Sequence, residues 1–291
     1  MPPGTPWTIE LERESVLRSP SLEGRRADEW RELWFGHSNQ GAPPVLLYER
    51  VGSTNTIARQ LAEQGAPDRT IIIADEQSAG RGRGTKTFTT PPGKALLLSI
   101  LIRPTRRLDE DAAPGTIPLR VGLAAARALD QIARTRTMLK WPNDLQLERD
   151  RAYGKVAGIL CEGSLTTRDG GFIIAGIGVN LTQHAGELPT GLSQTPTSVY
   201  LSTGKMISRG SLAGAIIQEI ESIHDRIMDR FDDSELRELQ ERDPLLDHQI
   251  MVDGEPAGVA KGVAPDGTLQ IIGGDGRTTY LRNGTVRPII P

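Results

Sequence analysis

The residues best suited to chemistry lie in one glycine- and arginine-rich segment, residues 78–94, which reads SAGRGRGTKTFTTPPGK. Glycine tolerates positive φ angles, so backbone N–H groups in such a segment can turn toward a bound anion. The planar guanidinium groups of Arg81 and Arg83 can each hold a carboxylate or phosphate by two parallel hydrogen bonds. The segment therefore predicts a cationic lid over an anionic ligand. The alternative is an ordinary solvated basic loop.

Two common phosphate-binding motifs do not describe this segment. The Walker motif fails because Lys94 is followed by alanine and no glycine stands at the required distance before Gly93. The dinucleotide-binding motif fails because the GRGRG run has the wrong last interval and no helical pattern follows it. The lid must therefore find its partners elsewhere in the chain.

Composition disfavours several classes of function. The 291 residues carry a net charge of −3, so the basic lid is a local feature of a mildly acidic protein, which argues against bulk nucleic-acid binding. The single cysteine, Cys161, lies in an apolar run and is expected to be a buried core residue. The chain start shows no secretory signal pattern, and the longest apolar run is about eight residues against the ~20 that cross a bilayer. We therefore expect a cytoplasmic protein without membrane contact.

Apolar runs flank the lid and define the elements that must position it. Periodicity and capping residues predict strands and helices in mixture, with hairpin-like pairs among the strands. We expect strands at 45–51, 70–77, 95–103, 137–148 (with a Pro-Asn-Asp turn inside it), 154–163 and 172–181, and helices at 53–65, 117–133, from Ser208 or Ser211 to about 231, and 233–243. This pattern indicates an α+β fold in which helices flank a mixed β-sheet.

The sequence divides into three regions of different character. Residues 1–43 predict an N-terminal appendage with some helical spacing, and 44–243 predict the main domain. Residues 244–291 predict a small β-barrel, because short β segments alternate there with glycine-containing turns. We assign no residue of this last region to chemistry.

Four further stretches stand out beside the lid: 53–55 (STN), 140–144 (KWPND), 154–160 (GKVAGIL) and 176–180 (GIGVN). Each has an ordinary explanation. The first is a plausible helix cap, the second a turn, and the glycines of the last two allow close packing of strands. Taken singly, none of them defines a function.

Taken together and in this order with the EQSAGRGR segment, these stretches resemble the biotin–protein ligases. The resemblance runs from about Val45 to Pro291. It implies a class II synthetase-like catalytic domain of the biotin ligase type, followed by that family's small C-terminal β-barrel. Residues 1–43 lack a helix-turn-helix pattern, so we expect the monofunctional type without an N-terminal DNA-binding domain.

The resemblance also implies a reaction. Biotin would be activated by ATP as biotinyl-5'-AMP, and the biotinyl group would pass to a lysine of a biotin carboxyl carrier protein. ATP with Mg²⁺ and biotin are the implied small molecules, the carrier is the implied partner, and no nucleic acid is expected. Whether the chain forms a homodimer stays open.

Site residues are implied in the same way, residue by residue. Biotin would be bound by Ser53, Thr54, Asn55, Gln77, Gly80, Arg81, Lys155 and Gly158, and the nucleotide by Arg83, Lys140, Asn143, Asp144 and Asn180. Arg81 would meet the biotin carboxylate. The catalytic residues would be Lys155, Arg83 and Asp144, with Asp144 either near Mg²⁺ or orienting the incoming lysine.

The sequence departs from the family's pattern inside the lid. The family's loop usually continues as Gly-Arg-x-Trp one residue after GRGR. Here the corresponding residues are Thr85, Lys86, Thr87 and Phe88, and the glycine comes one position early, at Gly84. We expect this change to affect lid closure and ligand affinity rather than the reaction, because Phe88 is a smaller anchor than Trp.

Three other functions are weighed against this one. A lipoate or octanoate ligase shares the fold and acyl-transfer logic but needs a longer apolar channel. A biotin-responsive DNA-binding repressor needs an N-terminal winged helix, which residues 1–43 do not resemble. A non-catalytic biotin-binding module gives no reason to keep Arg83, Lys155 and Asp144.

Overall fold

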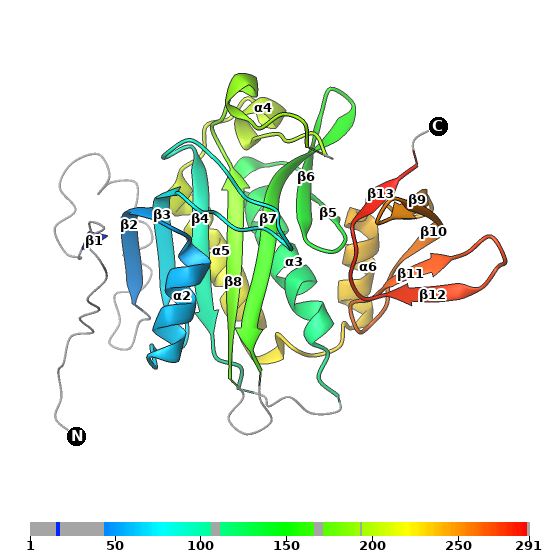
Figure 1. The fold of residues 1–291 in the computed structure, drawn as a ribbon, viewed down its shortest axis with the longest axis horizontal. Helices are drawn as coiled ribbons and strands as arrows, with labels where there is room; N and C mark the ends of the chain where they lie inside the picture. Colours follow the sequence, from blue (N-terminus) through cyan, green and yellow to red (C-terminus); the bar gives the residue numbers. More distant parts are fainter. Residues whose placement is uncertain (1–15, 18–43, 106–110, 166–170, 193, 290–291) are drawn as a thin grey trace.

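The computed structural model describes residues 16–17, 44–105, 111–165, 171–192 and 194–289. Its main body is an eight-stranded sheet in the order β1-β2-β3-β4-β8-β7-β6-β5 (Figure 1). The strands are β1 Val16–Leu17, β2 Val45–Val51, β3 Ile71–Gln77, β4 Ala95–Ile102, β5 Met138–Lys140, β6 Asp144–Arg149, β7 Ala152–Ser164 and β8 Phe172–Asn180. Strands β2 and β3 are parallel and the other neighbours are antiparallel, so the predicted mixed sheet is confirmed.

Helices cover the two faces of this sheet unequally (Figure 1). Helices α3 (Ile117–Ala133) and α5 (Arg209–Ile223) pack on one face, and α2 (Thr54–Glu63) packs on part of the other. Because side chains alternate along a strand, Leu98 of β4 joins the α3 and α5 core while Leu101 joins the α2 core. The rest of the α2 face is left for a ligand site. The remaining helices are α4 Val199–Thr203 and α6 Asp233–Arg242, with 3-10 turns at Pro114–Thr116, Ala185–Glu187 and His224–Arg226.

A second sheet of five antiparallel strands forms the C-terminal unit, in the order β12-β11-β10-β9-β13. Its strands are β9 Gln249–Val252, β10 Glu255–Val263, β11 Leu269–Ile272, β12 Thr278–Leu281 and β13 Val286–Pro288. Within the described residues β12 and β13 do not pair with each other, so the predicted barrel is open. One apolar core runs through both units, and Trp141 Nε1 donates to the Gly267 carbonyl across the junction at 3.0 Å.

The structure refines three expectations about the elements. The predicted strand 137–148 is a hairpin, in which the expected turn around Pro142 separates β5 from the antiparallel β6. The helix predicted to run to about 231 ends at Ile223 and continues as a 3-10 turn. Of the predicted appendage 1–43, only Val16 and Leu17 lie within the described residues, where they form β1 beside β2. No helix among the described residues is long and apolar enough to span a membrane.

Candidate active site

The lid folds back on itself as an exposed arch. Gly82 N donates to the Lys86 carbonyl at 2.8 Å, and Phe88 N donates to the Gly80 carbonyl at 3.1 Å. Arg81 and Thr87 also form an antiparallel β-bridge across the arch. A Cβ on Gly80 would lie only 2.2 Å from the Phe88 carbonyl oxygen, so glycine is required where the two ends of the arch meet.

Phe88 anchors the arch to the main sheet. A Cβ on Gly178 of β8 would lie 3.0 Å from the Phe88 ring, so the ring rests directly on the backbone of that strand. The smaller aromatic residue therefore still reaches the sheet at the position where the sequence departs from the family's pattern.

Beneath the arch, the start of α2 and the end of β3 form a polar cradle. Thr54 donates to Gln77 Oε1 from its backbone N at 2.8 Å and from its hydroxyl at 3.0 Å. The Ser53 side chain makes no capping hydrogen bond, although Ser53 stands at the N-cap of α2. Within the described part of the chain, Ser53 Oγ and Gln77 Nε2 have no hydrogen-bond partner from the protein. They are the polar groups of the cradle that remain available to a ligand.

Asn55 is fully engaged by the protein. Its Nδ2 donates to the Leu160 carbonyl at 3.1 Å and to Glu162 Oε2 at 2.9 Å, and its Oδ1 accepts from Ser99 Oγ at 2.7 Å. A Cβ on Gly176 would lie 2.1 Å from Asn55 Oδ1. Asn55 therefore fixes the wall of the cradle and is not itself a free donor or acceptor.

The cavity beneath the arch is narrow, with a volume of about 70 Å³. Sites for small ligands usually measure roughly 300–1,000 Å³, so the arch must move before a ligand of that size can enter. The lining combines polar residues of the cradle with glycines of the sheet: Ser53, Thr54, Asn55, Gln77, Arg81, Gly82, Arg83, Thr87, Phe88, Leu97, Leu98, Asn143, Lys155, Gly158, Ile159, Leu160, Gly176, Ile177 and Gly178.

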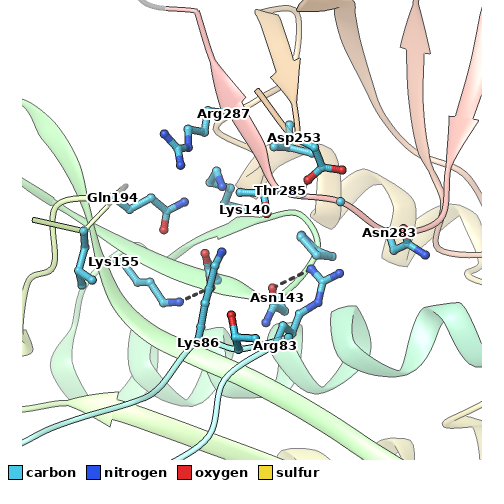
Figure 2. A pocket seen from close by; sticks show the side chains of 17 residues that line it. Arg83, Lys86, Lys140, Asn143, Lys155, Gln194, Asp253, Asn283, Thr285 and Arg287 are labelled. Atoms are coloured by element: carbon cyan, nitrogen blue, oxygen red, sulfur yellow. Dashed lines mark hydrogen bonds and ion pairs between the residues drawn. The ribbon is translucent and has the colours of Figure 1, made fainter. Parts of the chain in front are cut away.

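A second, larger cavity of about 480 Å³ opens beside the first (Figure 2). Its lining includes five cationic side chains, from Arg83, Lys86, Lys140, Lys155 and Arg287, and two carboxylates, from Asp144 and Asp253. The two cavities share Arg83, Asn143 and Lys155, so they form one cleft with a cradle end and a cationic end. Such a cleft suits a ligand with a polar uncharged head and an anionic tail.

Lys155 occupies the junction of the two ends. Its Nζ lies 2.6 Å from Asp144 Oδ1, and a Cβ on Gly158 would lie 3.4 Å from the same Nζ. Strand alternation would put residues 155 and 158 on opposite faces. The register between β6 and β7 shifts here, because Gln146 pairs with Lys155 while Leu145 pairs with Ala157. This β-bulge brings Lys155 and Gly158 to the same face.

Lys140 is the most buried cation of the site. It is 5 % exposed, and burial together with the nearby cations lowers its pKa to about 8, against the opposing effect of Asp144. With the Gln194 amide nitrogen oriented toward Asp144, that nitrogen donates to Asp144 Oδ2 at 2.9 Å and the amide oxygen accepts from Lys140 Nζ at 2.5 Å. Gln194 thus links the buried lysine to the carboxylate that holds Lys155.

The structure brings most of the expected nucleotide residues together but separates one. Asn143 lines both cavities, with Nδ2 donating to the Ile159 carbonyl at 2.6 Å and Oδ1 accepting from Arg83 at 3.5 Å. Asn180 is absent from both linings. It donates to the Thr197 carbonyl at 3.0 Å and accepts from Gln183, so it holds the neighbouring loop. The expected contact of Asn180 with nucleotide is revised to a supporting role.

The structure pairs Arg81 within the protein. Its guanidinium forms a fork with Glu162, with Nη2 2.6 Å from Oε1 and Nη1 3.1 Å from Oε2. Glu162 lies on β7 seven positions beyond Lys155, at the cradle end of the cleft. Arg81 and Arg83 both line the cradle cavity with Lys155, and of the two only Arg83 also lines the cationic end, so the expected contact of Arg81 with a carboxylate stays a prediction.

Four residues of the site were missed by sequence reasoning: Ser99, Glu162, Gln194 and Arg287. Ser99 and Glu162 carried a signal, because a lone polar residue within or directly after an apolar strand needs a partner. Arg287 was missed because we assigned no chemistry to residues 244–291. That expectation is wrong in geometric terms, since Asp253, Arg287 and the segment 283–286 line the cationic end.

The side chains of the site can be compared with the ligands that a metal ion needs. Among the described residues no group of three or more His, Cys, Asp or Glu side chains is placed to hold a metal ion. Asp144 offers one carboxylate, already paired with Lys155. This donor set fits a Mg²⁺ ion that arrives with phosphates and not a resident ion, because Mg²⁺ commonly uses one or two carboxylates and completes its shell with phosphate and water.

The sequence and fold were compared with known proteins. Residues 47–180 match the model of the Biotin/lipoate A/B protein ligase family. The bifunctional ligase/repressor BirA of Bacillus spizizenii is 29 % identical over 212 residues, which cover 72 % of this chain and 62 % of that protein. A biotin–[acetyl-CoA-carboxylase] ligase of Mycobacterium tuberculosis is 31 % identical, with 60 % of this chain and 61 % of that protein covered. The chain thus spans less than two thirds of the length of these two relatives.

Among solved structures, the biotin protein ligase from Aquifex aeolicus in complex with biotin and ATP superposes with a TM-score of 0.69. It is 24 % identical, and the match covers 84 % of this chain and 99 % of that chain. The likeness confirms the predicted fold class, a mixed sheet with flanking helices and a small C-terminal β unit.

The residues 47–180 that match this family model contain the cradle, the arch and Lys155. The Mycobacterium tuberculosis relative and the Aquifex aeolicus structure are named as biotin ligases, and the Bacillus spizizenii relative is named as a ligase/repressor. The biotin–protein ligases are therefore the group that this chain resembles.

Proposed function

We propose that this protein is an ATP-dependent biotin–protein ligase, which forms biotinyl-5'-AMP and transfers the biotinyl group to a lysine of a biotin carboxyl carrier protein. The observation that carries the proposal is the single cleft that joins a small polar cradle to a cationic end through Lys155. The names of the relatives, and the biotin and ATP bound in the Aquifex aeolicus ligase, support it.

The cradle fits the ureido ring of biotin. That ring is uncharged and has two N–H donors and one carbonyl acceptor. Among the described residues, the Gln77 Nε2 donor and the Ser53 hydroxyl are the cradle's polar groups without protein partners, and Thr54 holds the Gln77 side chain in place. Leaving such a buried group unpaired costs about 1–3 kcal/mol, so the cradle would select a ring that satisfies it.

The cationic end fits the first chemical step. A carboxylate oxygen of biotin attacks the α-phosphorus of ATP, the bond to the bridging oxygen breaks, and pyrophosphate leaves with the electron pair. Lys155 and Arg83 lie where the carboxylate and α-phosphate would meet, and they would offset the charge that develops there. Lys140, Lys86 and Arg287 would face the remaining phosphates.

The second step needs an amine that is not protonated. The carrier lysine attacks the acyl carbon of the adenylate, AMP leaves, and the amine loses a proton. Asp144 lies beside Lys155 and is the carboxylate nearest this centre by its 2.6 Å ion pair. We propose that it orients the incoming amine, and that Mg²⁺, which neutralises phosphate charge, enters with ATP.

The partner and the setting of the reaction follow from the same proposal. The carrier protein would approach through the open cationic end, since the cradle end is closed by the arch. A cytoplasmic location, the absence of DNA binding and a main domain at 44–243 stay predictions. Deletion of residues 1–40 should leave biotin-dependent pyrophosphate release intact, and a gel shift of the full chain at moderate salt should show no sequence-dependent DNA binding.

Mass spectrometry of a carrier domain tests the proposal directly. The domain is incubated with the enzyme, ATP, Mg²⁺ and biotin, and the expected result is a gain of one biotinyl group on one lysine. A carrier whose acceptor lysine is replaced by arginine is the control and should gain nothing. If the carrier gains a lipoyl or octanoyl group from the corresponding acid and none from biotin, the lipoate ligase alternative is correct instead.

The buried Lys140 predicts a pH dependence of ATP binding. Because its pKa is lowered to about 8, the side chain is cationic below that pH and neutral above it. Bound phosphates favour the cationic form, so ATP binding should take up a proton, and affinity should fall about tenfold between about pH 7 and about pH 9. Calorimetry in buffers of different ionisation enthalpy measures both effects. Lys140→Arg should remove this pH dependence, since the guanidinium stays charged; an unchanged slope in that variant would contradict the assignment.

A further inference from the structure

Glu162 is a partly buried carboxylate beside the cradle that the proposed chemistry does not use, and it pairs with Arg81, which lines the cradle cavity. It lies on β7 opposite Ile174 of β8, at the end of the cradle remote from Lys155. Its side chain is 16 % exposed, whereas that of its partner Arg81 is 47 % exposed. A carboxylate that is buried to this extent is usually paired with a cation or another hydrogen-bond donor.

Glu162 forms hydrogen bonds to two separate segments of the chain, the start of α2 and the arch. One oxygen, Oε2, accepts from Asn55 Nδ2 at 2.9 Å and from Arg81 Nη1 at 3.1 Å, while Oε1 accepts from Arg81 Nη2 at 2.6 Å. Asn55 belongs to the rigid cradle, and Arg81 belongs to the arch. The fork geometry of an arginine and a carboxylate fixes direction as well as distance.

The arch behaves as a unit with respect to this contact. The internal hydrogen bonds of residues 80–88 are made between their own backbone groups and do not involve Glu162. Opening the fork therefore removes one fastening of the arch without breaking its internal hydrogen bonds, while Phe88 still rests on Gly178 and Arg83 on Asn143. The 70 Å³ cavity beneath the arch requires the arch to move before biotin can enter or leave.

We propose that Glu162 is a positioning residue that fastens the arch over the ring end of the cleft through Arg81 while holding Asn55 in the cradle. The inference rests on the proposed function for its ligand, biotin, but the fastening itself is a property of the free protein. Glu162 controls how long the ring and the acyl-adenylate stay bound, and Lys155 at the other end carries the chemistry.

Glu162→Gln tests the fastening with little change of shape. Its amide oxygen, in the place of Oε2, still accepts from Asn55 and from Arg81 Nη1, whereas its amide nitrogen cannot accept from Arg81 Nη2, so the variant removes the charge and the shorter arm of the fork. In the protein without ligand, hydrogen exchange of residues 80–88 should become about tenfold faster. Arg81→Gln should have the same effect, and the double variant should add nothing further, because both changes break one contact. Glu241→Gln, which removes a surface carboxylate paired with Arg136, is the matched control.

Biotin kinetics supply the second measurement. In Glu162→Gln, biotin should dissociate about tenfold faster, and the KM for biotin should rise by more than kcat falls. A purely structural role would lower the melting temperature and leave the exchange of the arch and the release of biotin as in wild type; that result would overturn the inference. If wild type itself binds no biotin, the proposed function fails, while the exchange experiment still decides the role of Glu162.

Discussion

Replacement of Lys155 by alanine is expected to slow biotin-dependent pyrophosphate release by a factor of about 10²–10³, since electrostatic donors aimed at developing charge contribute about 3–4 kcal/mol. The residue stands where the cradle and the cationic end meet, 2.6 Å from Asp144. Biotin binding without ATP should weaken far less, because the ring is held by the cradle around Gln77. Steady-state pyrophosphate release and calorimetry with biotin alone make the two measurements.

Two further variants test the same assignment. Lys155→Arg should restore only part of the rate, because the guanidinium is longer and planar. Lys261→Ala removes a lysine that pairs with Asp247 in the C-terminal unit, outside both cavity linings, and should leave the rate as in wild type. Pyrophosphate release at the wild-type rate by Lys155→Ala would show that the catalytic centre lies elsewhere.

Gly176→Ala is expected to lower the affinity for biotin by about 100-fold, although it adds a single methyl group. That group would lie 2.1 Å from Asn55 Oδ1, so Asn55 must move. Three hydrogen bonds fix Asn55, and their loss leaves buried polar groups unpaired at about 1–3 kcal/mol each. Calorimetric titration with biotin measures the change.

Gly214→Ala provides the control for this substitution. Gly214 lies in α5, and a Cβ there meets nothing within 4 Å. Alanine favours a helix more than glycine does, so this variant should keep wild-type affinity and a melting temperature at least as high. Wild-type affinity in Gly176→Ala would mean that Asn55 is not part of the biotin site.

The local pattern of apolar residues was enough to predict the helices and strands in which that pattern is regular. The run from Ile117 to Ala133 has the bounds of α3, because an apolar helix flanked by a Pro start and a polar end leaves little ambiguity. The strands on either side of the lid were predicted for the same reason, since continuous apolar runs such as β4 are buried on both faces.

Tertiary geometry accounts for what the pattern could not predict. A period of two places Lys155 with Ala157, and only the bulge opposite Gln146 turns Lys155 to the face of Gly158. Arg81 and Arg83 stand two apart in an identical GR repeat, and the family resemblance assigned Arg81 to the biotin carboxylate and Arg83 to the nucleotide. In the structure Arg81 pairs with Glu162, which is 81 residues away in the sequence, and local sequence patterns cannot predict a contact at that separation.

The contribution of the C-terminal unit could not be predicted because its residues carry no motif. Arg287 follows an ordinary turn, and Asp253 is a turn residue with a φ of 50°. They reach the site only because the small sheet docks against the main one, with Trp141 bonded to Gly267.

The cationic end has one wall from each sheet, with Lys140 and Lys155 on one side and Arg287 on the other (Figure 2). A nucleotide held there would contact residues of both sheets, so its binding should make the two sheets harder to separate. Fluorophores placed at Asp150, in the β6–β7 turn, and at Asp275, in the β11–β12 turn, would sit on different sheets. Energy transfer between the two fluorophores would report any change in the distance between the two sheets when an unlabelled nucleotide binds or leaves.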